Sequence, residues 1–144
     1  MTIDVRVGPE PLPLTPPPVP AADGAVVAFW GVVRGEEPRG SIAALEYEAY
    51  APMAEVELRA IAAEAAARWP LGWVRIHHRV GRLAAGEASV WIAVAAPRRA
   101  QAFAACRYVL EQLKRRAPIW KREIAADGAA RWRGGRRLRA RRDG

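Results

Sequence analysis

Residues 88–118 read ASVWIAVAAPRRAQAFAACRYVLEQLKRRAP, and this stretch decides the fold class. Its first part, residues 88–96, is apolar enough for a strand that is buried on both faces of a sheet. Pro97 then opens an amphipathic helix over residues 98–116. The apolar stripe of that helix is Ala102, Cys106, Val109 or Leu110, and Leu113. Pro118 ends the helix, because proline cannot donate the backbone hydrogen bond that a helix needs.

Outward from this stretch, the hydrophobic pattern alternates between strand and helix periods. Further strands are expected at residues 3–7, 25–34, 41–50, 73–80 and 119–124, and RWR at 131–133 closes the fold. In the strand at 25–34, Gly31 indicates a bulge or a close contact. Apolar residues at three- and four-residue steps predict a helix from Met53 to Trp69, which Pro70 ends. The order of elements predicts an α+β domain in which two helices pack on a mainly antiparallel sheet.

A chain of 144 residues is expected to form a single domain, here residues 1–132. Residues 8–24 hold most of the prolines, which predicts an extended connector on the surface. Residues 133–144 form a basic tail for which we expect disorder. No apolar run approaches the roughly 20 residues of a membrane span, and the N-terminus lacks the pattern of a signal peptide. We therefore expect a cytoplasmic protein that does not associate with membranes.

The formal net charge of +8 is concentrated at the C-terminus. Residues 131–144 hold seven arginines and one aspartate, which leaves a net charge of only +2 on the remaining 130 residues. A nucleic-acid-binding domain is expected to carry its charge on a folded face, so this distribution disfavours that class. A nucleic-acid-binding module that uses the arginine-rich tail stays open as an alternative.

Only two of the 23 basic residues are lysines, Lys114 and Lys121. Lysine differs from arginine in that it can lose its proton, and burial or neighbouring cations make that loss easier. Arg115, Arg116 and Arg122 supply such cations in the sequence. Such a lysine can therefore serve as a nucleophile or as an acid–base group. Two solvated surface lysines are the other interpretation that the residues alone leave open.

Three arginines are candidates for binding an anion. Arg98 and Arg99 open the second helix, where a cation is unfavourable against the helix dipole unless an anion binds at the same place. Arg34 ends a buried strand and enters the loop GEEPRG at 35–40, a position that can line a cleft. Exposed surface arginines are the alternative at all three positions.

The remaining polar candidates favour structural roles. His77 and His78 are adjacent in a strand and point to opposite faces, so they do not ligate one metal ion together. Cys106 is the only cysteine, which excludes an internal disulfide and any site built from several cysteines. Its place on an apolar stripe favours a small buried side chain over a nucleophile. Glu46 and Glu48 share one face of a strand, either as a carboxylate pair or as solvent-facing residues.

Four stretches together resemble a known family, the large, catalytic subunits of molybdopterin synthase. They are GAVVAFWGVVRG (24–35), ALEYEAYAPMAE (44–55), HRVGRLAAGEASVWIAVAAPRRAQAFAACRYVLEQLKRRAPIWKRE (78–123) and DGAARW (127–132). The match lies in their order and spacing, from about residue 24 to residue 132. The resemblance implies an α/β hammerhead-type fold and a sulfurtransferase that contains no metal or other cofactor.

The same resemblance implies the reaction and the partners. Sulfur passes from the thiocarboxylated C-terminal Gly-Gly of a small ubiquitin-like subunit to cyclic pyranopterin monophosphate, which becomes the molybdopterin dithiolene. The implied assembly is a homodimer of large subunits within a heterotetramer, with one small subunit at each end. A non-catalytic scaffold for a ubiquitin-like partner is the alternative that keeps the assembly without the chemistry.

The resemblance also assigns catalytic residues. The family's two essential lysines fall on Lys114 and Lys121, within the frame LK-x-R-x-P-x-WK-x-E. It implies proton transfer or contact with the acyl end of the partner's tail for Lys114. For Lys121 it implies substrate binding and stabilisation of developing negative charge, with Arg122 and Glu123 adjacent in the substrate site.

The implied anion site departs from the family pattern in two places. The strand arginine falls on Arg34, with Val32 and Val33 beside it, but Gly35-Glu36-Glu37 replaces the usual Asn-His-Asn. The helix-opening His-Arg pair falls on Arg98 and Arg99, so arginine replaces the histidine. An anion-binding role survives that replacement, whereas a proton-transfer role does not.

Overall fold

A computed structural model describes residues 1–13, 15–37, 40–126 and 130–137. The strands are β1 (Thr2–Gly8), β2 (Ala25–Val32), β3 (Glu36–Glu37), β4 (Gly40–Ala49), β5 (Trp73–Arg79), β6 (Gly81–Ala84), β7 (Ala88–Ala96), β8 (Ile119–Ala125) and β9 (Ala130–Arg137). The helices are α1 (Ala51–Arg68) and α2 (Arg99–Arg116). Neither helix is long and apolar enough to cross a membrane.

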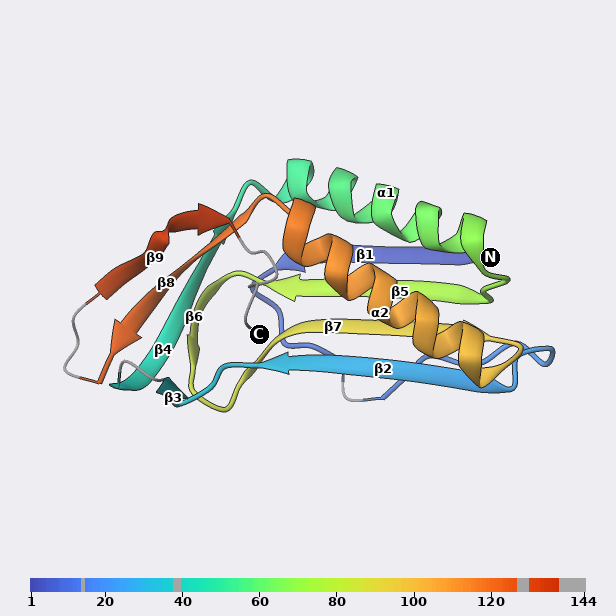
Figure 1. The fold of residues 1–144 in the computed structure, drawn as a ribbon, viewed down its shortest axis with the longest axis horizontal. Helices are drawn as coiled ribbons and strands as arrows, with labels where there is room; N and C mark the ends of the chain where they lie inside the picture. The colour runs from blue at the N-terminus through green and yellow to red at the C-terminus, as the bar shows by residue number, and fades with distance from the viewer. Residues whose placement is uncertain (14, 38–39, 127–129, 138–144) are drawn as a thin grey trace.

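Two sheets divide the molecule (Figure 1). The first has the order β1-β5-β7-β2, with β1 parallel to β5 and the other neighbours antiparallel. Both helices lie over one face of this sheet (Figure 1). The second sheet has the order β3-β4-β8-β9, with β6 also paired to β4, and lies at one end of the first. The expected α+β architecture, mainly antiparallel with two packed helices, is confirmed.

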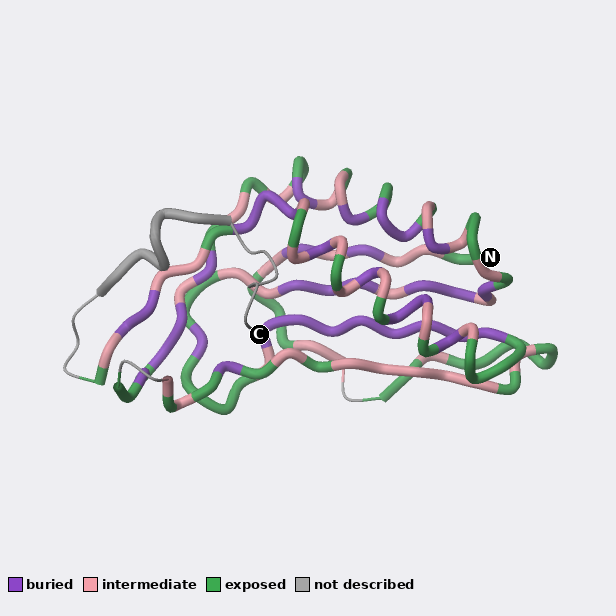
Figure 2. Tube along the Cα trace, viewed as in Figure 1, coloured by how far each residue is buried: buried purple, intermediate pink, exposed green. Residues whose placement is uncertain are grey.

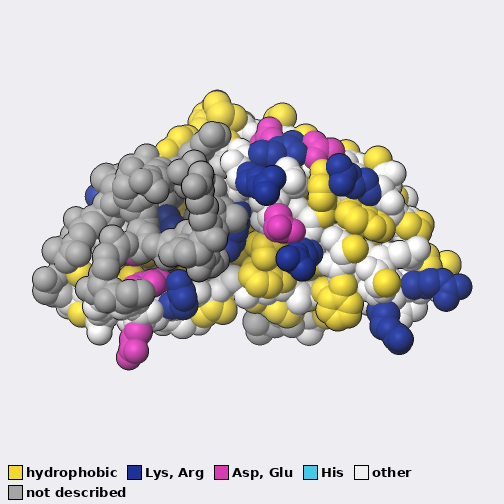
Figure 3. Space-filling model, viewed as in Figure 1, with side chains coloured by type: hydrophobic (Ala, Val, Ile, Leu, Met, Phe, Trp, Pro, Cys, Tyr) yellow, Lys and Arg dark blue, Asp and Glu magenta, His cyan; other side chains and the backbone are white. Residues whose placement is uncertain are grey.

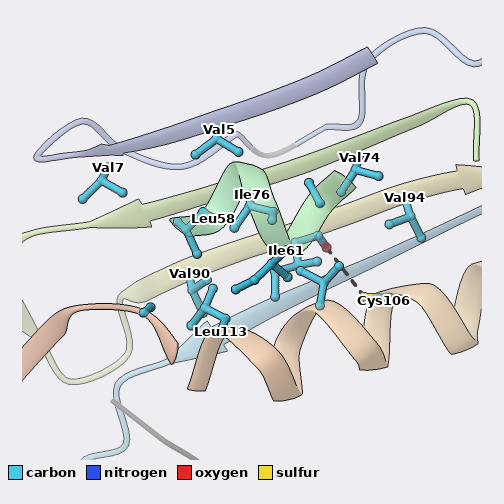
Figure 4. Packing of buried hydrophobic residues seen from close by; sticks show 14 of the residues in the cluster. Val5, Val7, Leu58, Ile61, Val74, Ile76, Val90, Val94, Cys106 and Leu113 are labelled. Carbon is cyan, nitrogen blue, oxygen red and sulfur yellow. Dashed lines mark hydrogen bonds between the residues drawn. The ribbon is translucent and has the colours of Figure 1, made fainter. Parts of the chain in front are cut away.

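The main core fills the layer between the helices and the first sheet (Figure 2). Buried residues of both helices meet the alternate inward residues of β5 and β7 there (Figure 4). Cys106 lies within this layer, with its Sγ 4.0 Å from the Ile92 carbonyl oxygen. Burial raises the pKa of its thiol to about 11, so it stays protonated at neutral pH. The expectation of a small buried side chain at this position is confirmed.

Most element boundaries match the sequence patterns. Helix α1 starts at Ala51, two residues earlier than expected, because a proline in the first turn has a φ that suits a helix start. At Gly31, the predicted bulge is present as a register shift between β2 and β7. A side chain there would place its Cβ 2.6 Å from Val90 Cγ1, so the close contact is also confirmed.

Two short strands and one boundary differ from the sequence patterns. The GEEPRG loop at 35–40 contains the two-residue strand β3, and Gly81–Ala84, for which no strand was predicted, form β6; both strands pair with β4. The expected domain end at residue 132 lies inside β9, because backbone pairing with β8 continues to Arg137. Residues 138–144 of the expected tail lie outside the described residues.

The proline-rich connector covers the face of the first sheet that the helices leave open. A small apolar cluster forms on that face from Trp73, Trp91, Ala93 and Ala95, and Leu12 of the connector packs against it. Trp73 Nε1 donates to the Pro18 carbonyl at 3.0 Å, and Trp30 Nε1 donates to the Pro13 carbonyl at 3.2 Å. The connector is therefore a strap that indole donors hold against the sheet.

Replacing Trp73 with phenylalanine is expected to destabilise the fold through this strap. The change keeps an aromatic ring but removes the indole donor, which leaves the Pro18 carbonyl without its partner. A hydrogen bond of this kind contributes about 1 kcal/mol to the free energy of unfolding. Urea unfolding should show a loss of that size for Trp73→Phe and a smaller one for Trp120→Phe on the second sheet. Equal effects from the two substitutions would contradict the role given to the strap.

Candidate active site

Figure 1 shows the corner at which α2 passes into β8. The two lysines lie on either side of this corner in the chain. Lys114 lies in the last turn of α2, and Lys121 lies in the first half of β8. The Ala117 N–H donates to the Leu113 carbonyl at 2.9 Å, and the Ile119 N–H donates to the Ala117 carbonyl at 2.8 Å. Leu113, Ala117 and Ile119 are all buried, so the corner is rigid. Both lysines are only half-buried, which leaves them accessible to a ligand.

Lys121 is next to a buried aromatic pair. It lies opposite Tyr47 in the β4–β8 ladder, and the Tyr47 ring packs edge-on against the His78 ring, with the centroids 5.1 Å apart. Burial, and to a smaller extent the positive charge of Lys121, lower the pKa of His78 to about 4. His78 Nδ1 lies 2.7 Å from the Arg79 carbonyl oxygen. At neutral pH the imidazole is uncharged, so Lys121 supplies the positive charge here.

The buried His78 predicts a stability that depends on pH. As the pH falls from 6.5 to 4, the unfolded chain binds a proton at this histidine while the folded chain does not, so the free energy of unfolding falls. With about 1.4 kcal/mol per pH unit, this histidine removes about 3 kcal/mol over that window. Urea unfolding between pH 4 and 7.5 should show a smaller decline for His78→Gln than for the wild type. Parallel pH profiles of the two proteins would contradict the assignment.

Arg122 and Glu123 extend the site along β8 on alternate faces. Arg122 forms an ion pair with Glu46, the residue opposite it on β4. This ion pair accounts for the presence of Glu46, so a carboxylate pair of Glu46 with Glu48 is not needed to explain it. Glu123 shares a face with Lys121 and is buried, with only 7% of its surface exposed. Lys121, Arg122 and Glu123 are therefore positioned by the same strand, β8.

Arg34 lies at the junction of the two sheets, just after β2. Val33 is buried, and its N–H donates to the Glu87 carbonyl at 2.9 Å, which fixes the chain before Arg34. The Arg34 side chain is 69% exposed, and its Nη2 lies 3.0 Å from Glu37 Oε1. The exposed Val32 precedes these two residues. An exposed ion pair contributes at most about 1 kcal/mol, so an incoming anion can replace Glu37.

Arg98 and Arg99 lie at the other end of α2 from Lys114. Arg98 is the N-cap, with its N–H donating to Gln101 Oε1 at 3.2 Å, and Arg99 is the first helical residue; both are exposed. At a rise of about 1.5 Å per residue, the helix separates Arg98 from Lys114 by about 24 Å. A single chain therefore does not bring the helix-opening arginines to the lysines.

Arg116 has a role that the sequence did not reveal. It does not crowd Lys114 as an unpaired cation; its Nε lies 2.7 Å from Glu57 Oε1, and its Nη1 lies 2.7 Å from Glu64 Oε1. Tyr108 OH donates to the same Glu64 at 2.7 Å. These hydrogen bonds, first that of Arg116, lower the pKa of Glu64 to about 2. Arg116 therefore connects the end of α2 to α1. In the sequence, the sign of this role was the spacing of Glu57 and Glu64, which lie seven residues apart on α1.

The histidines follow the sequence expectation. His77 lies on the face opposite His78, with its Nε2 2.8 Å from Asp4 Oδ2, and Arg75 Nη1 lies 2.9 Å from the same oxygen. Both histidines are buried. Within the described residues, no group of three histidine, cysteine or acidic side chains can hold a metal ion.

Over the residues that Figure 3 draws in colour, the face that carries the helices shows no continuous basic surface. Lysine and arginine side chains there are dispersed among hydrophobic and acidic ones (Figure 3). A nucleic-acid interface gathers its cations along one face or groove. This coloured part of the face therefore lacks the pattern expected of such an interface.

Comparisons with known proteins agree with this geometry. A family model described as MoaE protein matches residues 17–116. The molybdopterin synthase catalytic subunit of Nostoc sp. is 47% identical over 113 residues, which cover 78% of this chain and 68% of that protein. The molybdopterin synthase catalytic subunit of Salmonella typhimurium is 46% identical over 110 residues, with 76% and 73% covered.

Solved structures share the architecture. The crystal structure of molybdopterin synthase from Staphylococcus aureus matches with a TM-score of 0.82 and 38% identity, covering 90% of this chain and 96% of that chain. A protein–protein complex of subunits 1 and 2 of molybdopterin-converting factor from Helicobacter pylori matches with a TM-score of 0.69 at 17% identity, covering 94% and 92%. The second likeness shows the fold alone.

Proposed function

The chain belongs to the MoaE protein family, and from that premise we propose that it is the catalytic subunit of a molybdopterin synthase. In this function it transfers sulfur from the thiocarboxylated C-terminus of a small ubiquitin-like subunit to cyclic pyranopterin monophosphate. The observation that carries the proposal is the placement of Lys114 and Lys121 on the two sides of one rigid corner. A cytoplasmic location and a single folded domain belong to the same proposal.

The lysines suit the sulfur transfer. The thiocarboxylate sulfur attacks an electrophilic carbon of the pterin side chain, and the C–O bond at that carbon breaks as the C–S bond forms. Water then hydrolyses the resulting thioester at the acyl carbon of the tail, which leaves the sulfur on the pterin and a carboxylate on the tail. Lys121 donates hydrogen bonds to the oxygen on which negative charge develops. Lys114, across the corner, contacts the acyl end of the partner's tail or transfers a proton. His78 is uncharged and therefore adds no positive charge beside the ammonium of Lys121.

Arg34 suits the phosphate of the substrate. Arg34 is next to Gly35, whose carbonyl accepts the Ile42 N–H near the start of β4. Lys121 lies opposite Tyr47, further along the same strand. The five residue-to-residue steps from Ile42 to Tyr47 span roughly 16 Å of extended chain. A pterin with a cyclic phosphate, together with the end of a peptide tail, can bridge that separation.

Arg98 and Arg99 belong to the same site only if a second copy provides them. Along one helix they lie about 24 Å from Lys114, too far for a shared contact with one small substrate. We therefore place Arg98 and Arg99 in the site of the other large subunit, so that each site is complete only in the homodimer. The assembly is then a heterotetramer with one small subunit per site, and the two-subunit complex of the structural neighbour is consistent with that partner.

The decisive experiment is an assay of the purified chain with thiocarboxylated small subunit and cyclic pyranopterin monophosphate. Formation of molybdopterin that depends on the thiocarboxylate supports the proposed function. Tight binding of the small subunit without product would instead support the scaffold. Salt-sensitive binding of nucleic acid, lost on deletion of residues 133–144, would support the tail-based module.

A further inference from the structure

A pair of buried hydroxyl groups links the two sheets. Tyr47 lies on β4 in the second sheet, Ser89 lies on β7 in the first, and both residues are buried. Their side chains are hydrogen-bonded to each other, and Ser89 Oγ also donates to the Gly31 carbonyl at 3.3 Å. A buried hydrogen bond is costly to lose, because water does not reach the group that is left without its partner. The three residues therefore form a fixed connection from β4 through β7 to β2.

Ser89 owes its place in this connection to the bulge between β2 and β7. Gly31 of β2 pairs with Val90 of β7. The next residue, Val32, pairs with Ala88, so the register skips Ser89. The extra residue of a bulge bends its strand and redirects a side chain, and bulges are frequent beside active sites. Here the bulge places the serine hydroxyl within reach of both hydrogen-bond partners.

One end of the connection reaches Lys121. Tyr47 lies directly opposite Lys121 in the antiparallel β4–β8 ladder, so the two side chains extend from the same face, with Cβ atoms about 5 Å apart. The Tyr47 ring packs edge-on against His78, and the positive charge of Lys121 acts on the same histidine. The orientation of the Tyr47 ring therefore limits the directions in which the Lys121 side chain can extend.

The other end of the connection reaches Arg34. Gly31 lies three residues before Arg34, and the chain between them is held by the turn that precedes β7. The Val33 N–H donates to the Glu87 carbonyl at 2.9 Å, and the Val33 carbonyl accepts the Gly86 N–H at 2.8 Å. The place at which Arg34 leaves the first sheet is therefore set by the bulge and by the serine that bonds to it.

We propose that Tyr47 and Ser89 are positioning residues that hold Lys121 and Arg34 at a fixed separation. The proposal rests on the proposed function, in which Lys121 and Arg34 act on one substrate from two different sheets. Both hydroxyl groups are buried, so they act through these two residues and not through contact with the substrate. Without the bond, each strand keeps its own ladder but the two sheets lose a direct tie. A shift of about 1 Å between reacting groups is enough to slow a reaction by up to about 100-fold.

The scarcity of lysine allows Lys121 to be observed directly. The chain contains only two lysines, so reductive methylation with ¹³C-formaldehyde labels those two side chains and the N-terminal amine. Lys121→Arg identifies the Lys121 signal by its loss. Ser89→Ala keeps the Tyr47 ring but removes its partner, so we expect the Lys121 methyl resonance to move by more than its linewidth. Ser41→Ala is the matched control, because it makes the same change at an exposed position of β4 and should leave the resonance in place.

Single-turnover sulfur transfer supplies the second measurement. Ser89→Ala and Tyr47→Phe are each expected to lower the rate at saturating substrate about ten-fold, whereas Ser41→Ala should stay within about two-fold of the wild type. The variant that carries both Ser89→Ala and Tyr47→Phe should lose no more than the slower single variant, because both changes remove the same bond. Thermal unfolding of each variant identifies a loss of rate that comes from unfolded protein.

Several results would overturn the proposal. One is a Lys121 resonance that does not move in Ser89→Ala, or that moves as far in Ser41→Ala. Others are wild-type rates in both Ser89→Ala and Tyr47→Phe, or losses that multiply in the double variant. The methyl spectrum needs no turnover, so it decides the effect on Lys121 even if the wild type forms no product. Absence of product from the wild type would count against the proposed function alone.

Discussion

Lys121→Ala is expected to lower the rate of sulfur transfer by about 10²–10³-fold, the loss typical of removing a preorganised donor to a developing negative charge. The residue lies at a fixed place in the β4–β8 ladder, opposite the buried Tyr47, so the backbone from which its side chain extends does not have to move during the reaction. Single-turnover kinetics with thiocarboxylated partner and cyclic pyranopterin monophosphate measures the effect. Lys114→Ala is expected to show a loss of similar order from the other side of the corner.

Two further variants separate chemistry from charge and stability. Arg115→Ala removes an exposed cation beside Lys114 and should leave the rate within about two-fold of the wild type, because exposed charges act weakly through water. Lys121→Arg keeps the positive charge but not the compact ammonium, so it should recover little activity. Wild-type turnover in Lys121→Ala, or equal losses in Lys121→Ala and Arg115→Ala, would contradict the proposed role. Thermal unfolding of each variant identifies any loss that comes from misfolding.

The sequence patterns predicted those parts of the fold that depend on local periodicity. The run from Pro97 to Pro118 predicted α2 to within one residue, because prolines mark both ends of its period. The short strands β3 and β6 were not predictable in this way. Each exists because β4 offers a partner, and that pairing has no local signal. The strap was predicted as extended chain, but its docking on Trp73 depends on a contact between distant residues.

The candidate site likewise contains features that the sequence predicted and features that it did not. The placement of Lys114 and Lys121 on the two sides of one corner follows from seven residues of sequence that bend at a proline, so a local argument predicted it. The sequence also predicted the uninterrupted helix that separates Arg98 from Lys114. The length of that helix keeps the two residues of one chain out of a shared anion pocket, which becomes clear only from the three-dimensional structure. Arg116 was assigned to the wrong environment, because its partners Glu57 and Glu64 lie on a different helix.

Mixing two inactive variants is expected to restore about a quarter of the wild-type activity. One variant is Lys114→Ala and the other is Arg98→Ala with Arg99→Ala. If each site takes its lysines from one chain and its helix-opening arginines from the other, a mixed dimer holds one intact site and one site that lacks both groups. Random exchange makes half of all dimers mixed, and half of their sites are intact. The quarter follows from subunit arithmetic alone.

The reciprocal mixture supplies the control. A chain that carries all three substitutions, mixed equally with wild type, leaves intact sites only in dimers of two wild-type chains, a quarter of the total. If each site were built from one chain, half of the sites would stay active in this mixture, and the first mixture would stay inactive. Measured turnover of the two mixtures therefore separates the shared site from the single-chain site. The about 24 Å of helix between Arg98 and Lys114 favours the shared one.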